Sequence, residues 1–530
     1  MKSNNHHSRF DRLKMVSRQT GSLLVLLGLT MVIPLIVSLI YGEFFTSLGF
    51  LISSLICIAA GFSLYKGLHT SVEPLHRHAL IIAALGWLSV AIMGGLPYMI
   101  TAYITPAESA EQFCQPGADY ISSLYFFRNP LHSIFEGMSG FTTTGLSMAV
   151  HEPSIGKGLL FYRSWTQLLG GAGFVILSLA VFGHSNGRTA YLLYGAESTG
   201  ERLRPSIIDT ARSIWKVYIG ITLFSFVYMV IGTLIILPDY SLTENIFGSV
   251  NHAMAAQSTG GFSTLDDSIA GYRSAGMEML YVLPMILGAL ALPFYVRVIY
   301  DKQISQIWKN IQTRAVIILS ILGSIVLSFM LMKTGGISEP FRVGIFQFVS
   351  GLSTTGWQTS DVHAWDSASI AFLVSAGMIV GGAAGATVGG IKIIRVLLIF
   401  KGLFWQVSSF FSSESSIKVV RFNEKRLLPE EMNRELAAAA TFSFIYLLFV
   451  LVSTLITYYL MGSGYSLKDA LFESASAQGT VGLSCGITNP GMSPFLEILY
   501  IIQMWAGRLE IIPVLVLFRT IFFGTKAKVV

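Results

Sequence analysis

Charged residues are scarce in this sequence. Asp, Glu, Lys and Arg make up 12% of the 530 residues, whereas hydrophobic residues make up 53%. A soluble domain typically carries about 25% charged residues. The scarcity excludes an ordinary soluble protein and indicates a chain that is solvated largely by lipid.

Cysteines are also few, and a cleavable signal peptide is not expected. Cys57, Cys114 and Cys485 show no metal-binding or redox spacing, so we interpret them as free thiols. The first 20 residues are polar and basic, and the apolar run after them is too long for the core of a signal peptide.

Long apolar runs are what the sequence has in abundance. A membrane-spanning helix needs roughly 20 mostly apolar residues. Ten segments meet this requirement: 22–41, 44–65, 79–103, 159–183, 213–237, 276–300, 314–334, 367–400, 436–461 and 495–523. The sequence therefore predicts a polytopic membrane protein.

Basic residues concentrate on one set of loops between these segments. They gather in 1–20, 66–77, 188–216, 297–314, 392–434 and 519–528. Cytoplasmic loops carry the excess of Lys and Arg in membrane proteins, so we expect both termini in the cytoplasm. The same distribution accounts for the net charge of +6 without a nucleic-acid partner.

A short motif recurs four times between the apolar segments. It consists of a hydroxyl residue, one further residue and a glycine: Thr143-Thr144-Gly145, Ser258-Thr259-Gly260, Thr354-Thr355-Gly356 and Thr480-Val481-Gly482. Nine residues before each glycine stands a polar residue: Glu136, Asn251, Gln347 and Glu473. The recurrence predicts four copies of one unit, namely an outer helix, a short re-entrant helix, a loop and an inner helix.

The re-entrant helices are predicted at 130–142, 244–256, 340–352 and 466–478. They are too short to cross a hydrocarbon core of ~30 Å, and their partly negative C-terminal ends favour a cation. A ring of four loops can replace the hydration shell of a potassium ion with carbonyl oxygens. Glycines that only let helices pack closely are the alternative, but this does not explain the recurrent hydroxyl residue.

The third inner segment contains a glycine-rich stretch. Gly381, Gly382, Gly385, Gly389 and Gly390 fall within ten residues, and each costs a helix roughly 1 kcal/mol relative to alanine. We therefore expect the helix to break there. A phosphate-binding loop is excluded because no Ser or Thr follows Lys392.

Arg508 lies at a similar depth in the fourth repeat, as far beyond Gly482 as the glycine-rich stretch lies beyond Gly356. A charge at that depth faces a cavity or a partner. Pairing with Glu510, or with loop carbonyls, is the structural alternative to a role in gating.

Other polar residues carry weaker signals. We interpret His132 and His252 as core histidines rather than ligands, and Glu136 and Glu473 as hydrogen-bonding supports for the loops. The stretch 402–435 is the longest inside loop, and its segment 418–426 resembles a hairpin around Asn423 and Glu424.

These motifs resemble those of the Trk/Ktr/HKT superfamily of potassium transporters. The similar segments are FEGMSGFTTTGLS (135–147), AAQSTGGFST (255–264), SGLSTTGWQTSD (350–361), SAQGTVGLS (476–484), RSWTQLLGGAGF (163–174), GGAAGATVGGIKIIR (381–395) and MWAGRLEI (504–511). The resemblance covers residues 79–523. Two spans precede it, which is typical of the Trk-type membrane subunit, whereas the fourth loop is closer to the Ktr type.

The resemblance implies a fold and an ion site. The fold is an all-α polytopic membrane protein with four pseudo-equivalent helix–pore loop–helix repeats around one pore, plus two extra N-terminal transmembrane helices. Backbone carbonyls of Thr143, Thr144, Ser258, Thr259, Thr354, Thr355, Thr480 and Val481 would bind potassium, next to Gly145, Gly260, Gly356 and Gly482. In plant members a serine at the first glycine accompanies sodium permeation, so Gly145 favours potassium. Gly261 and Trp357 depart from the four-fold pattern.

The resemblance also implies regulation and partners. The glycine-rich stretch would be an intramembrane gate that acts together with Arg508. The partners would be a cytosolic nucleotide-binding RCK-type regulatory subunit, a second copy of the chain in a homodimer, and membrane lipid. The location would be the cytoplasmic (inner) membrane, and no organic cofactor or enzymatic activity is expected.

The predicted division of the chain follows the repeats. It is 1–20 (cytoplasmic), 21–78 (two extra helices), 79–187, 188–312 and 313–401 (repeats 1 to 3), 402–435 (cytoplasmic loop) and 436–530 (repeat 4). Sodium-stimulated Ktr-type transport and symport of potassium with protons or sodium remain alternatives. Inverted repeats around a midplane site are disfavoured because all four repeats share one orientation. A hydrolase is excluded because the segment around Ser139 lacks the G-x-S-x-G spacing.

Overall fold

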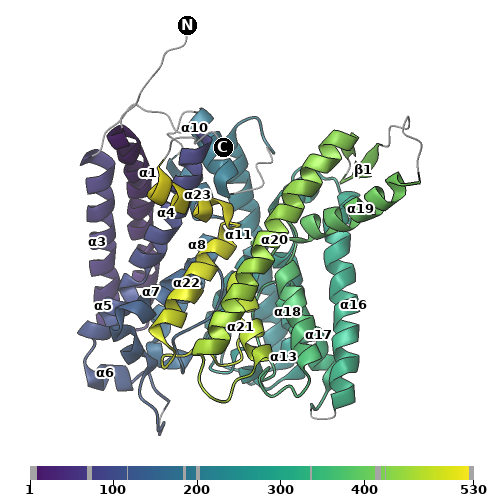
Figure 1. Cartoon of the computed structure of the whole chain (residues 1–530). Helices are drawn as coiled ribbons and strands as arrows, with labels where there is room; N and C mark the ends of the chain where they lie inside the picture. The colour runs from purple at the N-terminus through teal and green to yellow at the C-terminus, as the bar shows by residue number, and fades with distance from the viewer. Residues whose placement is uncertain are drawn as a thin grey trace.

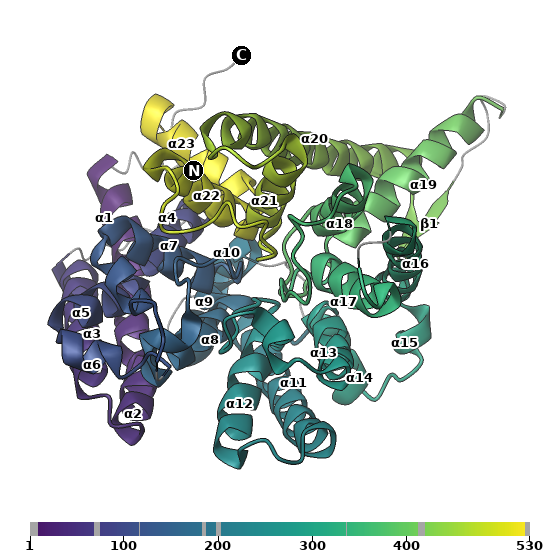
Figure 2. The same ribbon diagram turned by 90° about the horizontal axis from the view of Figure 1, so that it is seen from below.

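The computed structural model describes residues 9–67, 75–115, 117–182, 187–197, 203–334, 337–411, 419–423 and 425–524. In these ranges the chain is almost wholly helical. Viewed along the axis of the bundle, four helical units surround a common centre, and the N-terminal helices stand outside them at one side (Figure 2). The predicted fold class is confirmed.

The N-terminal helices and the first two repeats account for the first half of the chain. The N-terminal group is α1 (Arg9–Thr30), α2 (Val32–Ile40) and α3 (Phe44–Gly67). The first repeat contains α4 (His76–Gly94), α5 (Leu96–Ile104), α6 (Ala107–Glu111), η1 (Ser123–Arg128), α7 (Pro130–Phe141), η2 (Glu152–Ile155), α8 (Lys157–Gly171) and α9 (Phe174–Phe182), and α10 (Gly187–Glu197) follows it. The second contains α11 (Ile207–Ile236), α12 (Leu242–Ser258), η3 (Ser268–Tyr272), α13 (Ala275–Gly288), α14 (Leu292–Ile299) and α15 (Gln306–Lys309).

The third and fourth repeats complete the ring. The third contains α16 (Ile311–Thr334), α17 (Pro340–Leu352), α18 (Ala368–Val380) and α19 (Ile393–Ser409). The hairpin strands β1 (Val420–Phe422) and β2 (Lys425–Leu427) pair antiparallel, with Arg421 opposite Arg426. The fourth contains α20 (Pro429–Leu460), α21 (Leu467–Gly479), α22 (Pro494–Arg508) and α23 (Ile512–Phe523). The predicted hairpin is confirmed, although Lys418 and Glu424 lie outside the described residues.

The short pore helices α7, α12, α17 and α21 lie within two residues of their predicted bounds. Local chemistry fixes where they begin. Asn129 caps α7 by accepting a hydrogen bond from the N–H of Leu131, and Pro130 and Pro340 occupy first-turn positions, where a missing N–H costs nothing. Ser466 and Asp469 form a capping box at the start of α21.

The inner helices are more broken than the sequence predicts. Only the third was expected to be interrupted, but α8 and α9 meet at 78°, α13 and α14 at 89°, and α22 and α23 at 117°. Continuous helices over 159–183, 276–300 and 495–523 are therefore wrong predictions. Pro293 and Pro513 stand in the first turn after two of the bends, where proline starts a new helix more readily than it continues an old one.

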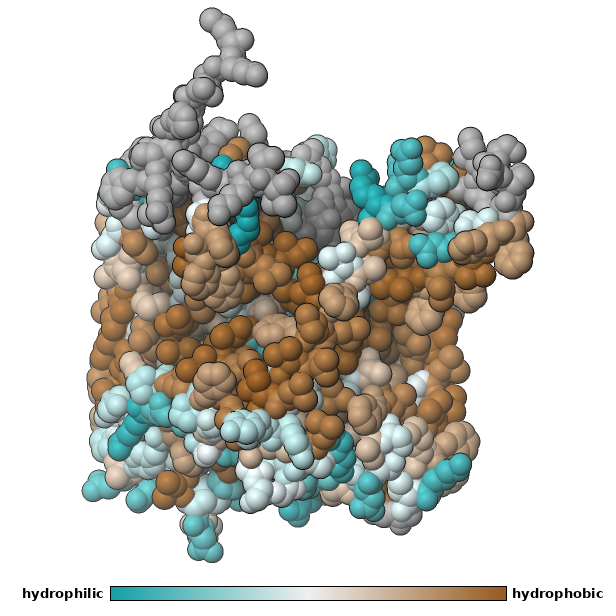
Figure 3. Space-filling model, in the orientation of Figure 1, coloured by the Kyte–Doolittle hydropathy of each residue, from teal (hydrophilic) through white to brown (hydrophobic). Residues whose placement is uncertain are grey.

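On the face drawn in Figure 3, a broad apolar belt lies between two more polar ends. Within the described ranges, six helices are long and apolar enough to cross a membrane, or nine spans if each bent pair counts as one. The tenth predicted segment corresponds to α18, the glycine-rich stretch and the start of α19. The protein is thus a multi-pass membrane protein. Helix α10 and the β-hairpin, both from predicted cytoplasmic stretches, lie at the same end of the bundle (Figure 1).

Candidate functional site

The four pore helices end in loops that share one backbone conformation. A threonine at or just beyond the helix end takes a left-handed φ of 48–57°, and a glycine two residues later has a φ of 78–100°. The threonines are Thr143, Thr259, Thr354 and Thr480, and the glycines are Gly145, Gly261, Gly356 and Gly482. A positive φ is uncommon for threonine, so its recurrence identifies four copies of one loop. We call residues 143–145, 259–261, 354–356 and 480–482 the ring loops.

Backbone hydrogen bonds set the register of the ring loops. In each, the N–H of the residue before the glycine donates to the carbonyl five residues earlier. The pairs are Thr144–Ser139 (2.9 Å), Gly260–Ala255 (2.8 Å), Thr355–Ser350 (3.0 Å) and Val481–Ser476 (2.9 Å). The equivalent glycine of the second repeat is therefore Gly261. The alignment that equates Gly260 with Gly145 is wrong by one residue, and Ser258 is the last residue of α12.

The ring loops close on one another. A Cβ placed on Gly145 would lie 2.4 Å from the carbonyl oxygen of Gly260, and one on Gly261 would lie 2.1 Å from that of Thr355. The third and fourth loops continue the pattern, from Gly356 to Val481 (1.8 Å) and from Gly482 to Thr144 (2.3 Å). Each glycine thus packs against the carbonyl just before the next glycine, and only glycine leaves room for that approach. The four carbonyls belong to one closed ring.

A side chain nine residues before each ring glycine holds the backbone after it. Glu136 accepts from the N–H of Met148 at 2.9 Å, and Glu473 accepts from that of Cys485 at 2.8 Å. Gln347, with its amide oxygen turned toward the donors, accepts from Thr359 at 2.8 Å. The expected supporting role of the two glutamates agrees with these contacts.

His252 completes this set in the second repeat. Its Nε2 accepts a hydrogen bond from the N–H of Thr264 at 3.3 Å. The sequence alignment, which is wrong by one residue in this repeat, gives this supporting position to Asn251 instead. The histidine is fully buried, and its Nδ1 lies 2.8 Å from the hydroxyl of Tyr281. The sequence did contain a signal for the correct register: Gly261-Phe262-Ser263 matches the Gly-Leu-Ser that begins at the ring glycine of two other ring loops.

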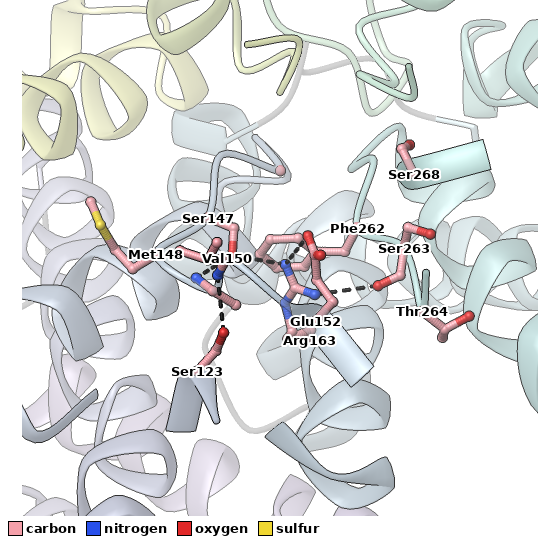
Figure 4. Close-up of polar contacts among 12 residues, drawn as sticks. Ser123, Ser147, Met148, Val150, Glu152, Arg163, Phe262, Ser263, Thr264 and Ser268 are labelled. Atoms are coloured by element: carbon pink, nitrogen blue, oxygen red, sulfur yellow. Dashed lines mark hydrogen bonds and ion pairs between the residues drawn. The ribbon is translucent and has the colours of Figure 1, made fainter. Parts of the chain in front are cut away.

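A buried ion pair lies within the first repeat on the outer side of the ring, and its arginine also reaches the second repeat. Arg163 Nε lies 2.8 Å from Glu136 Oε1, and both side chains are almost wholly buried. The guanidinium also donates to the Ser147 hydroxyl at 3.0 Å and the Ser263 carbonyl at 3.3 Å (Figure 4). Removal of one partner from a buried ion pair strongly destabilises a protein, because the other charge is left buried and unpaired. Arg163 is therefore a structural residue on this side of the ring.

The ring opens outward into a cavity of about 470 Å³. The four ring glycines line its floor, and acidic residues line its wall: Glu152, Asp266, Asp267 and Asp361. Burial raises the pKa of Glu152 to about 8, which favours the neutral form of this carboxyl. The three aspartates give the entrance a negative charge, which attracts cations.

The glycine-rich stretch forms a loop on the opposite side of the ring. We call residues 381–392 the glycine-rich loop; α18 ends before it, and α19 begins after it. Thr387 Oγ1 lies 3.1 Å from Thr259 Oγ1, and the N–H of Gly389 donates to Thr354 Oγ1 at 3.3 Å. A Cβ on Gly389 would lie 2.0 Å from the carbonyl oxygen of Gly479. The loop thus lies directly against the inner face of the ring.

Arg508 binds this loop through carbonyl oxygens. It donates to Thr387 at 2.5 Å and to Gly170 and Gly171, at the end of α8, at 2.6 and 2.5 Å. Glu510 pairs instead with Lys392 at 2.7 Å and with Arg395. Of the two structural partners considered for Arg508, the loop carbonyl is therefore the observed one. The arginine connects repeats 1, 3 and 4.

Within the described residues, no group of three or more His, Cys, Asp or Glu side chains could hold a metal ion. His132, interpreted from the sequence as a core histidine, is buried and lies 2.9 Å from Glu497.

Comparison with known proteins identifies the family. The family model TrkH, described as a cation transport protein, matches residues 50–524. The chain belongs to the TrkH family of cation transport proteins. This membership confirms the resemblance seen in the sequence motifs, and it places the ring of loops in a family of transporters rather than of enzymes.

Individual relatives of this family member match over nearly their whole length. An uncharacterized cation transporter of Methanocaldococcus jannaschii is 31% identical, with 95% of each chain covered. The Trk system potassium uptake protein TrkH of Halomonas elongata is 28% identical, over 96% of this chain and 99% of that protein. The crystal structure of the potassium transporter TrkH from Vibrio parahaemolyticus matches with a TM-score of 0.78 at 23% identity, covering 96% of this chain and 99% of that one. The fold is shared throughout.

Proposed function

We propose that this TrkH family member takes up potassium across the cytoplasmic membrane through the ring of four loops. The observation that carries the proposal is the closed contact of each ring glycine with the carbonyl of the next loop. A ring of carbonyl oxygens is the kind of site that substitutes for the hydration shell of potassium. Relatives named as potassium uptake proteins support the choice of ion.

The proposed ligands are backbone carbonyls at two levels of the ring. They belong to Thr143, Thr144, Thr259, Gly260, Thr354, Thr355, Thr480 and Val481. Gly145, Gly261, Gly356 and Gly482 would permit their approach. Ser258 is not among the proposed ligands, because in the corrected register it lies one residue before the ring loop. Potassium is here the transported substrate.

The glycine-rich loop and Arg508 are proposed as the gate. The loop contacts the inner face of the ring, and Arg508 ties it to the end of α8 through charged hydrogen bonds. Gly381, Gly382, Gly385, Gly389 and Gly390 would let the loop leave that position, and the positive charge of Arg508 would repel a cation beside the path.

We also propose how this protein is regulated and assembled. The relatives are named as parts of a Trk system, which supports a cytosolic RCK-type regulatory subunit that binds nucleotides. The resemblance supports a homodimer in the inner membrane, and the charges of the loops support cytoplasmic termini.

The test is growth of a bacterium that lacks its own potassium uptake systems. Expression of this protein, with and without a candidate regulatory subunit, should restore growth at low potassium. Membrane expression without rescue in any combination would contradict the proposal.

A further inference from the structure

Gln167, on inner helix α8 of the first repeat, reaches across to the ring loop of the second. Its side chain is fully buried. Its Nε2 donates to the carbonyl of Gly260 at 2.5 Å, and its Oε1 accepts from the N–H of Phe262 at 3.2 Å. One side chain therefore binds the backbone on both sides of the ring glycine Gly261.

Gly260 stands where the other three ring loops have a residue with a side chain. Its counterparts are Thr144, Thr355 and Val481. The φ of Gly260 is not among the positive values, so the backbone itself accommodates an L residue there. What excludes a side chain is Gln167, because a Cβ on Gly260 would lie 2.4 Å from Gln167 Cδ. The glutamine occupies the space of the missing side chain.

The second ring loop also differs in how its carbonyl is bonded. In the part of the chain that the structure describes, no side chain donates to the carbonyls of Thr144, Thr355 or Val481, whereas Gln167 donates to that of Gly260. A carbonyl that already accepts a hydrogen bond shares its lone pairs and is held in place. The four carbonyls of this level are therefore unequal, and the difference resides in one residue of the first repeat.

We propose that Gln167 is a specificity-determining positioning residue, which holds the Gly260 carbonyl at a fixed place in the ring and so sets the preference for potassium over the smaller sodium ion. The proposal rests on the proposed function. A carbonyl released from this bond moves inward onto a smaller ion at less cost, so sodium gains relative to potassium.

Four variants separate the hydrogen bond from the filling of space. Gln167→Met keeps a side chain of similar length but donates nothing. Gln167→Ala removes both the donor and the side chain that fills the space beside Gly260. Gly260→Ala places a methyl group in that occupied space. The double variant, Gln167→Ala with Gly260→Ala, fills the space again but has no hydrogen-bond donor. Gln503→Met is the matched control, since Gln503 is a buried glutamine on inner helix α22 whose Nε2 donates to Ser474, outside the ring loops.

The measurement is potassium uptake into liposomes in competition with sodium. Gln167→Met and the double variant should both transport potassium but lose roughly fivefold of the preference over sodium, the size of one net hydrogen bond. Gly260→Ala alone should transport poorly, and the second substitution should restore transport. Gln503→Met should retain the preference of the unaltered protein.

Unaltered preference in both Gln167→Met and the double variant would overturn the proposal and leave Gln167 as a filler of space. Failure of the unaltered protein to take up potassium would instead contradict the proposed function, so the two failures are distinguishable.

Discussion

At the scale of residues, four threonines and four glycines with positive φ define the ring. The glycines matter for the space they leave, because a Cβ on any of them would lie 1.8–2.4 Å from the carbonyl oxygen of the next loop. The supporting residues Glu136, His252, Gln347 and Glu473 differ in chemistry but accept from the same backbone position. The shared feature of this position is thus a hydrogen-bond acceptor rather than a charge.

Serine at a ring glycine should therefore alter ion preference. For Gly145→Ser and for Gly261→Ser we expect potassium preference over sodium to fall about tenfold, a change of ~1.4 kcal/mol, because the new side chain displaces a ring carbonyl. Competition between the two ions in liposomes measures it. Gly462→Ser is the control, since a Cβ there meets nothing within 4 Å. If both ring variants kept the ion preference of the unaltered protein, the proposal that the ring selects the ion would be contradicted.

The residue types of the ring could be predicted from the sequence, but the register of the second loop could not be predicted from the motif alone. Two adjacent glycines, Gly260 and Gly261, fit the motif equally well when only hydroxyl and glycine are compared. Their backbone φ separates them. The role of Gln167 has no local signal, because it depends on a contact between residues 93 positions apart.

At the scale of elements, the pore helices follow from local chemistry, whereas the bends of the inner helices follow from it only in part. Caps, first-turn prolines and the motif fix the ends of α7, α17 and α21 to within two residues. The bends at the ends of α8, α13 and α22 lie within segments whose overall hydropathy predicts a single span, although Pro293 and Pro513 follow two of them. Contacts with the ring loops and the glycine-rich loop stabilise them, and such contacts have no periodic signature in the sequence.

Release of the glycine-rich loop should raise ion flux. Arg508→Ala removes hydrogen bonds to three carbonyls. A bond to a charged group contributes about 1.5–3 kcal/mol, so we expect flux to rise roughly tenfold or more. Deletion of three glycines from 381–390 should act in the same direction. The rate of potassium efflux from loaded liposomes measures both variants.

Arg519→Ala, an exposed arginine on the neighbouring helix α23, is the control for loss of positive charge. Reduced or unchanged flux in folded Arg508→Ala protein would contradict the proposed gating role of the glycine-rich loop and Arg508.

At the scale of the whole molecule, composition and long apolar runs were enough to predict a polytopic helical protein, and the recurrent motif was enough to predict four repeats. They could not predict how the repeats interlock. That depends on long-range contacts such as Arg163 with Ser263, Gln358 with Ser484, and Arg508 with Gly170. These contacts join repeats in pairs, so the ring and the loop beneath it behave as properties of the assembled chain rather than of any one repeat.

The assembled ring is proposed to select potassium. The most direct test is uptake of a labelled potassium analogue, rubidium, by liposomes that contain the purified protein, with unlabelled potassium or sodium as competitor. If the ring selects potassium, potassium will suppress uptake at concentrations at which sodium has little effect. Equal suppression by the two ions, in liposomes that take up the label, would contradict it.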